Sequence, residues 1–570
     1  MMNERMGSTY DRWVRSVAAS DVRELENLAA EPRELADAFA RDLSFGTGGL
    51  RGLMGLGPNR LNVYTVGRAT QGLANWLLAD CSAVGTSVAI AYDSRNHSAE
   101  FARRAASVLA GNGIHALVFP HLEPTPVLSY AVRRLGCAAG IVLTASHNPK
   151  EYNGYKVYGP DGCQATTEAC RSIQGAILKV DPFDDVRALP FETALDAGAV
   201  SWIDDELLDG YVNATVSCRA RQDLSNLSVV YTPLNGTGAE PVARVLREAG
   251  VTDYAVVPEQ AEANGDFPTC PKPNPEERAA LELAVALGER RGADLVLATD
   301  PDADRVGVAV LHEGSYELLT GNEVGLLLLD WLARRSRRSG SVAMTTIVSA
   351  PMADDLARAH GIELRRTLTG FKFIGEQIGL LEGEGREDDF LMGFEESYGY
   401  LAGTHVRDKD AMISCLLICE LAAEAKERGS DLYVDMRRLY DDYGHWGNEQ
   451  VSIRYAGADG PERMAALMAC LRTQPPASLA GLGVERMIDY LAGAEMPVVN
   501  PRPDEGVQTL PASNVLEFRL TGGSRVLVRP SGTEPKVKGY VFAKASTQDA
   551  AERLQTRLVS DLRTLLNGNE

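Results

Sequence analysis

In the first half of the chain, short runs of hydrophobic residues alternate with longer segments in which hydrophobic residues recur at helical spacing. Short apolar runs at 87–92, 115–119 and 138–146 are separated by longer segments, 98–113 and 125–136, in which apolar residues recur every three or four positions. Short apolar runs alternating with amphipathic helices are typical of βαβ units, whose strands lie parallel in one sheet. The pattern therefore predicts a βαβαβ unit with functional loops at the carboxyl ends of its strands.

Residues suited to helix ends support this prediction. Ser98 stands where a helix N-cap is expected, and Gly111 and Gly136 stand where the two helices should end. The same alternation returns twice, over 227–300, with a helix opened by Asn274-Pro275, and over 341–397. Three successive units of similar composition indicate a repeated architecture, although their letters are not close enough to prove a sequence repeat.

The last part of the chain has a different pattern. Strand-like runs at 514–520, 524–530 and 536–543 follow one another without intervening helices, and a long helix is predicted from Thr547. This order is typical of an α+β module. Length supports division into about four domains, because 570 residues exceed what one hydrophobic core usually serves.

The predicted fold class is therefore α/β: three successive mixed α/β domains followed by a C-terminal α+β domain. We place the boundaries near residues 210, 320 and 475. The predicted domains are 1–210, 211–320, 321–475 and 476–570.

Composition excludes several classes of protein. The formal charge of −21 argues against a nucleic-acid or anionic-membrane binder, because such partners require an extended basic face. The opening segment has no apolar stretch typical of a secretory signal, and the apolar run 324–333 is too short to span a bilayer. The nine cysteines are scattered without a Cys-x-x-Cys pair, and Cys415 and Cys419 are best explained as small core thiols. We expect a cytoplasmic protein.

The sharpest chemical signal is the segment 299–305, Thr-Asp-Pro-Asp-Ala-Asp-Arg, which follows an apolar run. Asp300, Asp302 and Asp304 alternate, so in an extended chain their side chains share one face. An oxygen-only cluster of this kind suits a hard cation such as Mg²⁺. A calcium loop is excluded because the glycine and glutamate that it needs at its sixth and twelfth positions are lacking. A solvated acidic turn is the remaining alternative, although clustered carboxylates repel one another without a cation or base.

A second signal is the segment 144–149, Thr-Ala-Ser-His-Asn-Pro, at the end of the apolar run 141–143. It places Ser146 in a strand-end loop, where a nucleophile is expected. No Gly-x-Ser-x-Gly elbow surrounds it and no other cue supplies an Asp–His pair, so acyl-transfer chemistry is poorly supported. By itself this segment also fits a simple polar turn.

A third signal, Arg-Pro-Ser-Gly-Thr-Glu-Pro-Lys at 529–536, follows another apolar run. One guanidinium, two hydroxyls and loop amides within a few residues suit a phosphate, although an ordinary hairpin turn remains open. No Walker A or Gly-x-Gly-x-x-Gly sequence supports nucleotide binding. The segment 393–399 places Glu395 and Ser397 as candidate acceptors for sugar hydroxyls, and loop 46–52 is glycine-rich; both are weak signals alone.

Together these motifs resemble the α-D-phosphohexomutase superfamily, in which a phosphoserine loop, a metal loop, a sugar loop and a phosphate loop follow one another, one per domain. All four occur in that order between about Phe45 and Lys538. The resemblance is strongest to the long subgroup of phosphoglucomutases and phosphopentomutases. It implies the predicted four domains arranged around a central cleft.

The resemblance also implies residue roles. Ser146 would carry the phosphoryl group and, through its phosphate, join Asp300, Asp302 and Asp304 in binding Mg²⁺. The remaining catalytic residues would be Arg51, His147, Lys156 and Lys372. The substrate would be held by Arg305, Thr369, Gly370, Glu395, Ser397, Arg529, Ser531, Gly532 and Thr533. Asn235 departs from the family, which commonly has His there.

The activity implied is an intramolecular phosphotransfer on a small phosphosugar, with glucose 1-phosphate and glucose 6-phosphate interconverted. Glucose 1,6-bisphosphate would be the intermediate and activator, because phospho-Ser146 donates to one hydroxyl before the other phosphate returns. Phosphomannomutase, phosphopentomutase and glucose 1,6-bisphosphate synthase are alternatives within the superfamily. A phosphatase acting through phosphoserine and a binding protein without turnover are alternatives outside it. Neither nucleic acid nor membrane is an expected partner, and the oligomeric state is not predicted.

Overall fold

The computed structural model describes residues 4–46, 48–80, 85–220, 223–455, 459–501, 507–531 and 536–567. The chain forms two compact units. Unit 1 comprises Met1–Ala309 and Thr404–Leu416, and unit 2 comprises Val310–Gly403 and Leu417–Glu570. None of the helices in the described segments combines the length and apolarity needed to cross a membrane.

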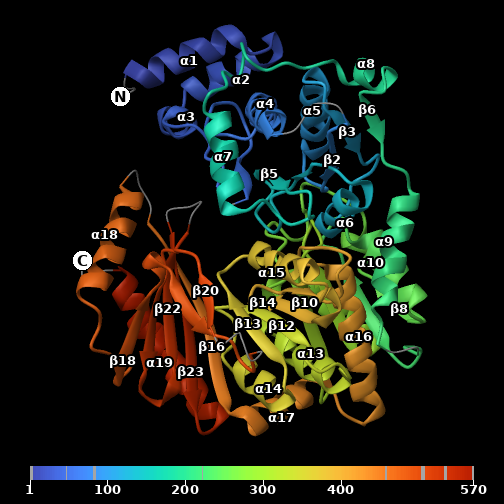
Figure 1. The fold of residues 1–570 in the computed structure, drawn as a ribbon, viewed down its shortest axis with the longest axis vertical. Coiled ribbons are helices and arrows are strands. Elements are labelled where there is room, and N and C mark those ends of the chain that lie inside the picture. Colours follow the sequence, from blue (N-terminus) through green and yellow to red (C-terminus); the bar gives the residue numbers. More distant parts are fainter. Residues whose placement is uncertain are drawn as a thin grey trace. The chain divides into compact units, whose positions relative to one another are not determined.

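Unit 1 begins with a six-stranded mixed sheet in the order β1-β5-β4-β2-β3-β6 (Figure 1). Its strands are β1 (Gly49–Leu53), β2 (Ser87–Tyr92), β3 (His115–Val118), β4 (Ala139–Leu143), β5 (Tyr152–Tyr158) and β6 (Val200–Trp202). Strand β2 pairs in parallel with β3 and β4, and β3 pairs in parallel with β6. Strand β5 runs antiparallel to both β4 and β1. The predicted βαβαβ unit is confirmed, and β1 and β5 extend it.

Unit 1 contains twelve complete helices in its described part. They are α1 (Glu4–Ser16), α2 (Ala19–Ala29), α3 (Pro32–Phe39), α4 (Val63–Asp80), α5 (Ser98–Gly111), α6 (Thr125–Leu135), α7 (Thr167–Ile177), α8 (Phe191–Asp196), α9 (Glu206–Ser217), α10 (Ala239–Glu248), α11 (Pro258–Ala261) and α12 (Arg278–Arg291). Helix α5 starts at Ser98 and ends at Gly111, and Gly136 ends α6 with a left-handed φ of 64°. Helix α12 begins at Arg278 rather than at Asn274, because a hydrogen-bonded turn from Glu277 N–H to the Asn274 carbonyl precedes it.

A second sheet has the strand order β11-β10-β9-β7-β8. Its strands are β7 (Ser228–Thr232), β8 (Asp253–Val256), β9 (Leu295–Thr299), β10 (Val306–His312) and β11 (Ser315–Leu319). Strand β7 pairs in parallel with β8 and with β9, and every residue of β9 is buried. The acidic segment predicted from the sequence leaves this sheet at the carboxyl end of β9.

Unit 2 contains a four-stranded sheet in the order β13-β12-β14-β15. Its strands are β12 (Val342–Thr346), β13 (Glu363–Thr367), β14 (Phe390–Glu395) and β15 (Gly399–Leu401), and its helices are α13 (Gly321–Arg335), α14 (Met352–His360), α15 (Phe371–Gly383), α16 (Ala411–Glu427, which begins in unit 1) and α17 (Leu432–Tyr443). Residues 324–333 are almost wholly buried within α13, as predicted. Cys415 and Cys419 are fully buried thiols of α16, which confirms their assignment to the core.

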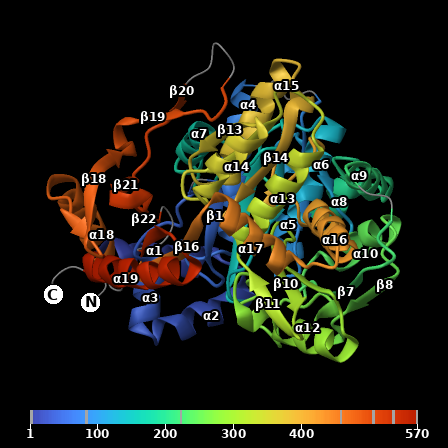
Figure 2. The same ribbon diagram turned by 90° about the horizontal axis from the view of Figure 1, so that it is seen from below.

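The C-terminal part of unit 2 is an antiparallel sheet in the order β16-β23-β22-β21-β18-β17. Its strands are β16 (His445–Arg454), β17 (Ser478–Leu479), β18 (Leu482–Asp489), β21 (Leu516–Leu520), β22 (Arg525–Pro530) and β23 (Lys536–Ala545), and β19 (Ala494–Pro497) pairs separately with β20 (Val507–Leu510). Helix α18 (Gly460–Thr473) precedes β17, and α19 (Gln548–Asn567) packs on β16 and β23 (Figure 2). Strand β16 precedes the predicted boundary at 475, and the boundaries themselves stay predictions.

Candidate active site

The acidic loop after β9 brings its three carboxylates together in a buried position. Asp300, Asp302 and Asp304 are at most 3% exposed, and one oxygen from each lies within 4.8 Å of the others. The loop is held by its own backbone, because Asp300 Oδ1 accepts the N–H groups of Asp304 at 3.1 Å and Arg305 at 3.0 Å. The carboxylates come together through a turn, closed by the Ala303 N–H and the Asp300 carbonyl at 2.9 Å, rather than through the extended chain expected from the sequence.

The carboxylates do not share one electrostatic state. Burial raises the pKa of Asp300 well above its ordinary value, and the charges of Asp302 and Asp304 raise it further. Burial also acts to raise the pKa of Asp302, but Lys156 and the hydrogen bond from Asp300 outweigh it and lower that pKa below its ordinary range. Burial and the charge of Asp302 raise the pKa of Asp304. Three carboxylates at this spacing therefore need cations around them.

Two lysines supply positive charge to the triad within unit 1. Lys156 of β5 places Nζ 2.7 Å from Asp302 Oδ2 and 3.9 Å from Asp304 Oδ2. Lys409, in the segment that rejoins unit 1, places Nζ 3.1 Å from Asp304 Oδ2 and 2.9 Å from Asp408 Oδ1. Lys156 was predicted from the sequence and Lys409 was not. The signal available was the charged run 407–410, directly before the apolar helix α16.

The donor set fits a divalent cation. Asp302 Oδ1 and Asp304 Oδ1 are buried carboxylate oxygens that accept no hydrogen bond. Leaving such atoms unpaired is costly, and a hard cation coordinated by oxygen removes the cost. The buried triad can therefore hold a metal ion.

Ser146 lies in the loop after β4 and points its hydroxyl at the acidic loop. Its Oγ donates to Asp300 Oδ2 at 2.6 Å and lies 3.1 Å from Nδ1 of His147. Ser146 is 3% exposed and has a left-handed φ of 51°, a costly conformation for a non-glycine residue. The Ser146 N–H donates to Thr144 Oγ1 at 2.8 Å, which helps to hold the strained turn.

Arg95 holds this loop, and sequence reasoning did not single it out. Its guanidinium donates to carbonyl oxygens of the loop: Ser146 at 2.6 Å, Pro149 at 2.9 Å, Tyr152 at 2.9 Å, and Asn148. Arg95 is 3% exposed, and Asp93 Oδ2 lies 3.3 Å from its Nε. The signal available was the polar segment 93–95 at the carboxyl end of β2.

Arg51, predicted as catalytic, and Arg305, predicted to hold the substrate, border the same loops. Arg51 of β1 donates through Nη1 to Asn148 Oδ1 at 3.2 Å, so it contacts the Ser146 loop. Arg305 follows the triad, with Nε 3.7 Å from Asp304 Oδ1 and an ion pair from Nη1 to Glu276. Unit 1 thus assembles the hydroxyl, the carboxylates and their basic partners from loops far apart in sequence.

In unit 2 the predicted sugar loop follows β14. Glu395 is 5% exposed, and its Oε1 accepts the backbone N–H of Gly370 at 2.8 Å, which joins this loop to the segment before α15. Thr369 Oγ1 is buried without a hydrogen-bond partner, and Lys372 in the first turn of α15 places Nζ 5.3 Å from the Phe373 ring centre. Ser397 lies partly exposed in the turn between β14 and β15.

Glu396, between the two predicted residues, is a half-buried carboxyl that the sequence did not single out. Burial and the charge of Glu395 raise the pKa of Glu396 to about 7, against the opposing charges of Lys538 and Arg529. Thr346 Oγ1 and Ser349 Oγ donate to its Oε2 at 3.2 and 3.4 Å. Because the charge of Arg529 acts to lower the pKa of Glu396, the predicted sugar loop and the strand that leads to the predicted phosphate loop interact electrostatically within unit 2.

Arg529 lies on β22, paired with Lys538 of β23. The Ser531 N–H donates to the Lys536 carbonyl at 2.8 Å. Gly532 and Thr533, also predicted to hold a phosphate, lie outside the described residues. Asn235, the departure from the family, is buried with φ 58°, and its Nδ2 donates to the Glu262 carbonyl at 2.8 Å.

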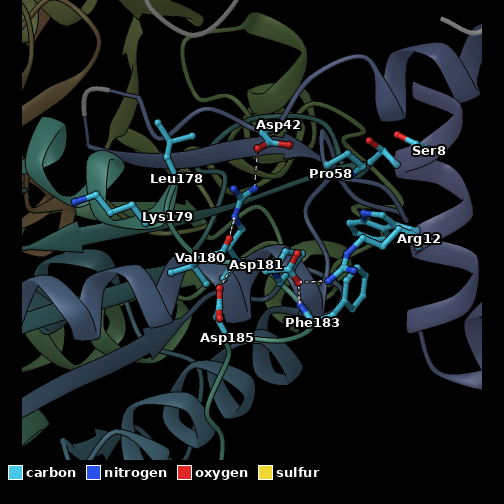
Figure 3. Close-up of a pocket in the computed structure, with 14 residues that line it drawn as sticks. Ser8, Arg12, Asp42, Pro58, Leu178, Lys179, Val180, Asp181, Phe183 and Asp185 are labelled. Carbon is cyan, nitrogen blue, oxygen red and sulfur yellow. Dashed lines mark hydrogen bonds and ion pairs between the residues drawn. The ribbon is translucent and has the colours of Figure 1, made fainter. Parts of the chain in front are cut away.

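Unit 1 also contains a pocket of about 440 Å³ that none of the predicted site residues lines (Figure 3). Two of its cations are paired with carboxylates: Arg12 contacts Asp181 at 2.8 Å and Arg68 contacts Asp42 at 2.8 Å. Lys179 also lines the pocket, at some distance from these two pairs.

Four regions of the chain match, in order, the models of the phosphoglucomutase/phosphomannomutase domains. They are α/β/α domain I at residues 42–183, α/β/α domain II at 209–314, α/β/α domain III at 320–440 and the C-terminal domain at 492–560. This order and the observed sheets confirm the predicted α/β fold class. They define the class of protein as a phosphosugar mutase, an isomerase that acts by intramolecular phosphotransfer.

Relatives and solved structures cover nearly the whole chain. The phosphoglucomutase of Staphylococcus saprophyticus is 33% identical over 542 residues, 94% of this chain and 97% of its own. The phosphoglucomutase of a bovine strain of Staphylococcus aureus is 35% identical over 534 residues, 92% and 94% of the two chains. The chain belongs to the phosphoglucomutase/phosphomannomutase family, within the α-D-phosphohexomutase superfamily.

Two crystal structures share the fold. A phosphoglucomutase/phosphomannomutase family protein from Burkholderia thailandensis has a TM-score of 0.65 and 18% identity, covering 92% of this chain and 98% of that one. The open form of pp63/parafusin, a phosphoglucomutase from Paramecium, has a TM-score of 0.65 and 18% identity, covering 92% and 94%.

Proposed function

We propose that this mutase interconverts glucose 1-phosphate and glucose 6-phosphate, with Ser146 as the phosphoryl carrier. The observation that carries the proposal is the 2.6 Å hydrogen bond from Ser146 Oγ to Asp300, the first carboxylate of the buried triad. A hydroxyl next to a metal-binding triad is where a phosphoryl group can be received and passed on. Relatives described as phosphoglucomutases, 33% and 35% identical over nearly the whole chain, support glucose as the sugar.

The residues around Ser146 have distinct parts in this proposal. His147 Nδ1, 3.1 Å from the hydroxyl, holds or moves its proton when the phosphate arrives or leaves. Lys156 and Arg51 neutralise charge on the transferring oxygens, and Lys409 keeps Asp304 paired. Because the strained turn aims the hydroxyl in advance, little reorganisation is needed at transfer.

Mg²⁺ is the cation that we propose for Asp300, Asp302 and Asp304, with the phosphate of Ser146 completing the donor set. When bound, it would draw charge from the phosphoryl oxygens and so favour their transfer. The two unpartnered oxygens, Asp302 Oδ1 and Asp304 Oδ1, support this assignment.

The groups that hold the sugar and its second phosphate are proposed from unit 2. Glu395 and Ser397 accept from or donate to sugar hydroxyls, and Lys372 contacts the sugar or takes its proton. Arg529 grips the phosphate that is not reacting, through its planar fork of donors. Further contacts are proposed for Thr369, Gly370, Ser531, Gly532 and Thr533, and for Arg305 of unit 1.

Glucose 1,6-bisphosphate follows from the chemistry as intermediate and activator. Phospho-Ser146 donates to the free hydroxyl of the monophosphate, and the other phosphate of the product then returns to Ser146. The intermediate must be held in two orientations, which needs a phosphate group away from the serine. We propose a cytoplasmic enzyme with small phosphosugars as its partners and neither nucleic acid nor membrane among them. In keeping with that location, the structure joins none of the eight cysteines in the described part of the chain in a disulfide.

Mass spectrometry of the Ser146 peptide tests the carrier role. After incubation with glucose 1,6-bisphosphate and Mg²⁺, we expect one phosphate on this peptide and none in Ser146→Ala, which should also lose transfer. Ser315→Ala, which removes an exposed hydroxyl on β11, is the matched control and should keep full activity. An unmodified Ser146 peptide in fully active enzyme would exclude the carrier role.

Comparison of kcat/KM across sugars tests the substrate separately. Glucose 1-phosphate should exceed mannose 1-phosphate, glucosamine 1-phosphate and ribose 1-phosphate. A higher value for ribose or mannose 1-phosphate would replace glucose in the proposal while leaving the phosphoserine mechanism intact.

A further inference from the structure

A cysteine, a histidine and an aspartate that have no part in the proposed phosphotransfer contact one another in unit 1. Cys218 follows the last residue of α9, and its Sγ lies 4.0 Å from Nδ1 of His405. The opposite ring nitrogen, Nε2 of His405, lies 3.2 Å from Asp410 Oδ2. The hydroxyl of Tyr211 donates to both oxygens of Asp410 at 2.8 Å. One side of the imidazole therefore faces a carboxylate fixed by other groups, and the other side faces sulfur.

The surroundings keep the imidazole charged. Burial alone would lower the pKa of His405, but the hydrogen bond with Asp410 and the contact with Cys218 raise it to about 9. With both ring nitrogens protonated, Nε2–H is directed at Asp410 and Nδ1–H at the sulfur. An imidazolium beside a thiol stabilises the thiolate, which is the reactive form of cysteine.

Access distinguishes Cys218 from most other cysteines in the described part of the chain. Six of these eight thiols are buried, while Cys218 is partly exposed and Cys470 of α18 is exposed. Cys470 has no histidine contact among those the structure records, so it provides an internal reference for an accessible thiol without an activating base.

We propose that Cys218 is a modification site that undergoes thiol–disulfide exchange with low-molecular-weight disulfides, assisted by His405. The thiol first loses its proton to solvent, and the thiolate then attacks one sulfur of the disulfide R–S–S–R. The new bond joins Cys218 Sγ to that sulfur, and the original S–S bond breaks with its electron pair on the departing RS⁻, which takes a proton from solvent. Cys218 is oxidised, one sulfur of the reagent is reduced, and the products are a mixed disulfide and R–SH.

Modification of Cys218 should affect phosphotransfer through Asp410. This residue accepts the N–H groups of Met412 at 2.8 Å and Ile413 at 3.2 Å, so it caps α16 while it pairs with His405. Its immediate neighbour is Lys409, whose Nζ contacts Asp304, and the N–H of Ala411 donates to the Ala303 carbonyl at 3.2 Å. A group attached to Cys218 displaces His405, removes one of the partners of Asp410 and shifts the segment that carries Lys409. Exchange at Cys218 should therefore lower turnover.

Glutathione disulfide is the probe for the first experiment, with peptide masses recorded over time at pH 7. Cys218 should be modified at least about 10-fold faster than Cys470 in the same sample, because a cationic imidazole beside a thiol promotes its attack on a disulfide. His405→Gln should remove most of this advantage, and Asp410→Asn, which keeps a helix-capping oxygen, should reduce it as well. The buried cysteines staying unmodified will show that each variant is folded. Equal rates at Cys218 and Cys470, or a rate unchanged in the folded variants, would overturn the proposal.

The second experiment follows turnover as the mixed disulfide forms. Wild-type kcat should fall several-fold in step with modification of Cys218 and recover with dithiothreitol. Cys218→Ser should keep its activity under the same treatment, and Cys470→Ser should respond as wild type does. Full activity of protein completely modified at Cys218 would overturn the coupling to Lys409. Because each variant is compared with itself before treatment, this result does not depend on which sugar is the substrate.

Discussion

Arg95 shows how one side chain can set the shape of a catalytic loop without touching the reacting group. Its guanidinium donates to four carbonyl oxygens from Ser146 to Tyr152, and three of these carbonyls lie in the loop before strand β5 begins at Tyr152. The loop therefore depends on a planar donor fork supplied by a different strand end. Lysine offers the same charge as a single point and cannot make these bonds together.

Arg95→Lys should keep the fold and lose much of the turnover. Hydrogen bonds from a charged donor contribute about 1.5–3 kcal/mol each, so the loss of two should lower kcat by roughly 100-fold or more if they hold the reactive geometry. Steady-state kinetics and thermal unfolding check this. Arg103→Lys, an exposed arginine of α5 paired with Glu192, is the matched control and should be neutral. Equal losses in the two variants would contradict the role of Arg95.

Glu123 should make the stability of unit 1 fall as the pH rises. Burial and the charge of Asp205 raise the pKa of Glu123 to about 8, against the opposing charge of Arg244. Since the folded state then binds the proton more tightly than the unfolded state, the free energy of unfolding should fall as pH rises from about 4.5 to 8.

Chemical denaturation at pH 5 and pH 8 tests this sign. Between pH 5 and pH 8, the free energy of unfolding of the wild type should fall by roughly 3–5 kcal/mol relative to that of Glu123→Gln. This follows from about 1.4 kcal/mol per pKa unit. Glu168→Gln, in which an exposed carboxylate of α7 is replaced, should show no such relative change. A stability difference that rises with pH would contradict the assignment.

At the scale of elements, the strand ends explain which residues could be predicted. Ser146 and Asp300 to Asp304 follow β4 and β9 directly, and local order in the sequence was enough to place them. Arg95 and Lys409 reach the same site from other segments, and their partners depend on tertiary pairing that no local pattern reveals. Helix periodicity likewise predicted α5 and α6, whereas β16 was not assigned because its partner, β23, lies far along the chain.

Gly154 tests how closely two strands must approach beside the Ser146 loop. Strand β5 runs between β1 and β4, the Thr144 N–H donates to the Gly154 carbonyl at 3.1 Å, and a Cβ at Gly154 would clash with the Thr144 carbonyl oxygen. Gly154→Ala should therefore lower the free energy of unfolding by about 1–3 kcal/mol. It should also lower kcat by a larger factor than it changes KM. Gly175→Ala in α7, where a Cβ meets no neighbour, should instead stabilise by about 0.5–1 kcal/mol. Thermal unfolding and kinetics of both variants check the contrast.

At the scale of the whole molecule, the proposed chemistry is divided between the units. The carrier serine and the acid triad belong to unit 1, and the groups proposed for the sugar and the second phosphate belong largely to unit 2. The division predicts that defects in unit 2 affect retention of the bisphosphate more than charging of the serine. This distinction separates a mutase from a phosphatase.

Arg529→Ala should lose about 2–3 kcal/mol of transition-state binding, judged from charge-assisted hydrogen bonds. Its activity should depend more steeply on added glucose 1,6-bisphosphate, because each escaped intermediate leaves Ser146 without a phosphate. Arg553→Ala, an exposed arginine of α19, serves as control. An unchanged kcat, KM and bisphosphate dependence would exclude Arg529 from the phosphate site.

Unit 1 is not continuous along the chain, and this affects its synthesis. Tyr158 donates to Asp408 at 2.6 Å although the two residues are 250 positions apart, and Lys409 follows directly. At about 5–20 residues per second, a ribosome needs on the order of 10–50 seconds to pass from one to the other. Throughout that interval the serine loop has been synthesised while the closing segment 404–416 is still missing. The yield of correctly folded unit 1 should therefore respond to codon usage across 310–403, a stretch that encodes none of its residues.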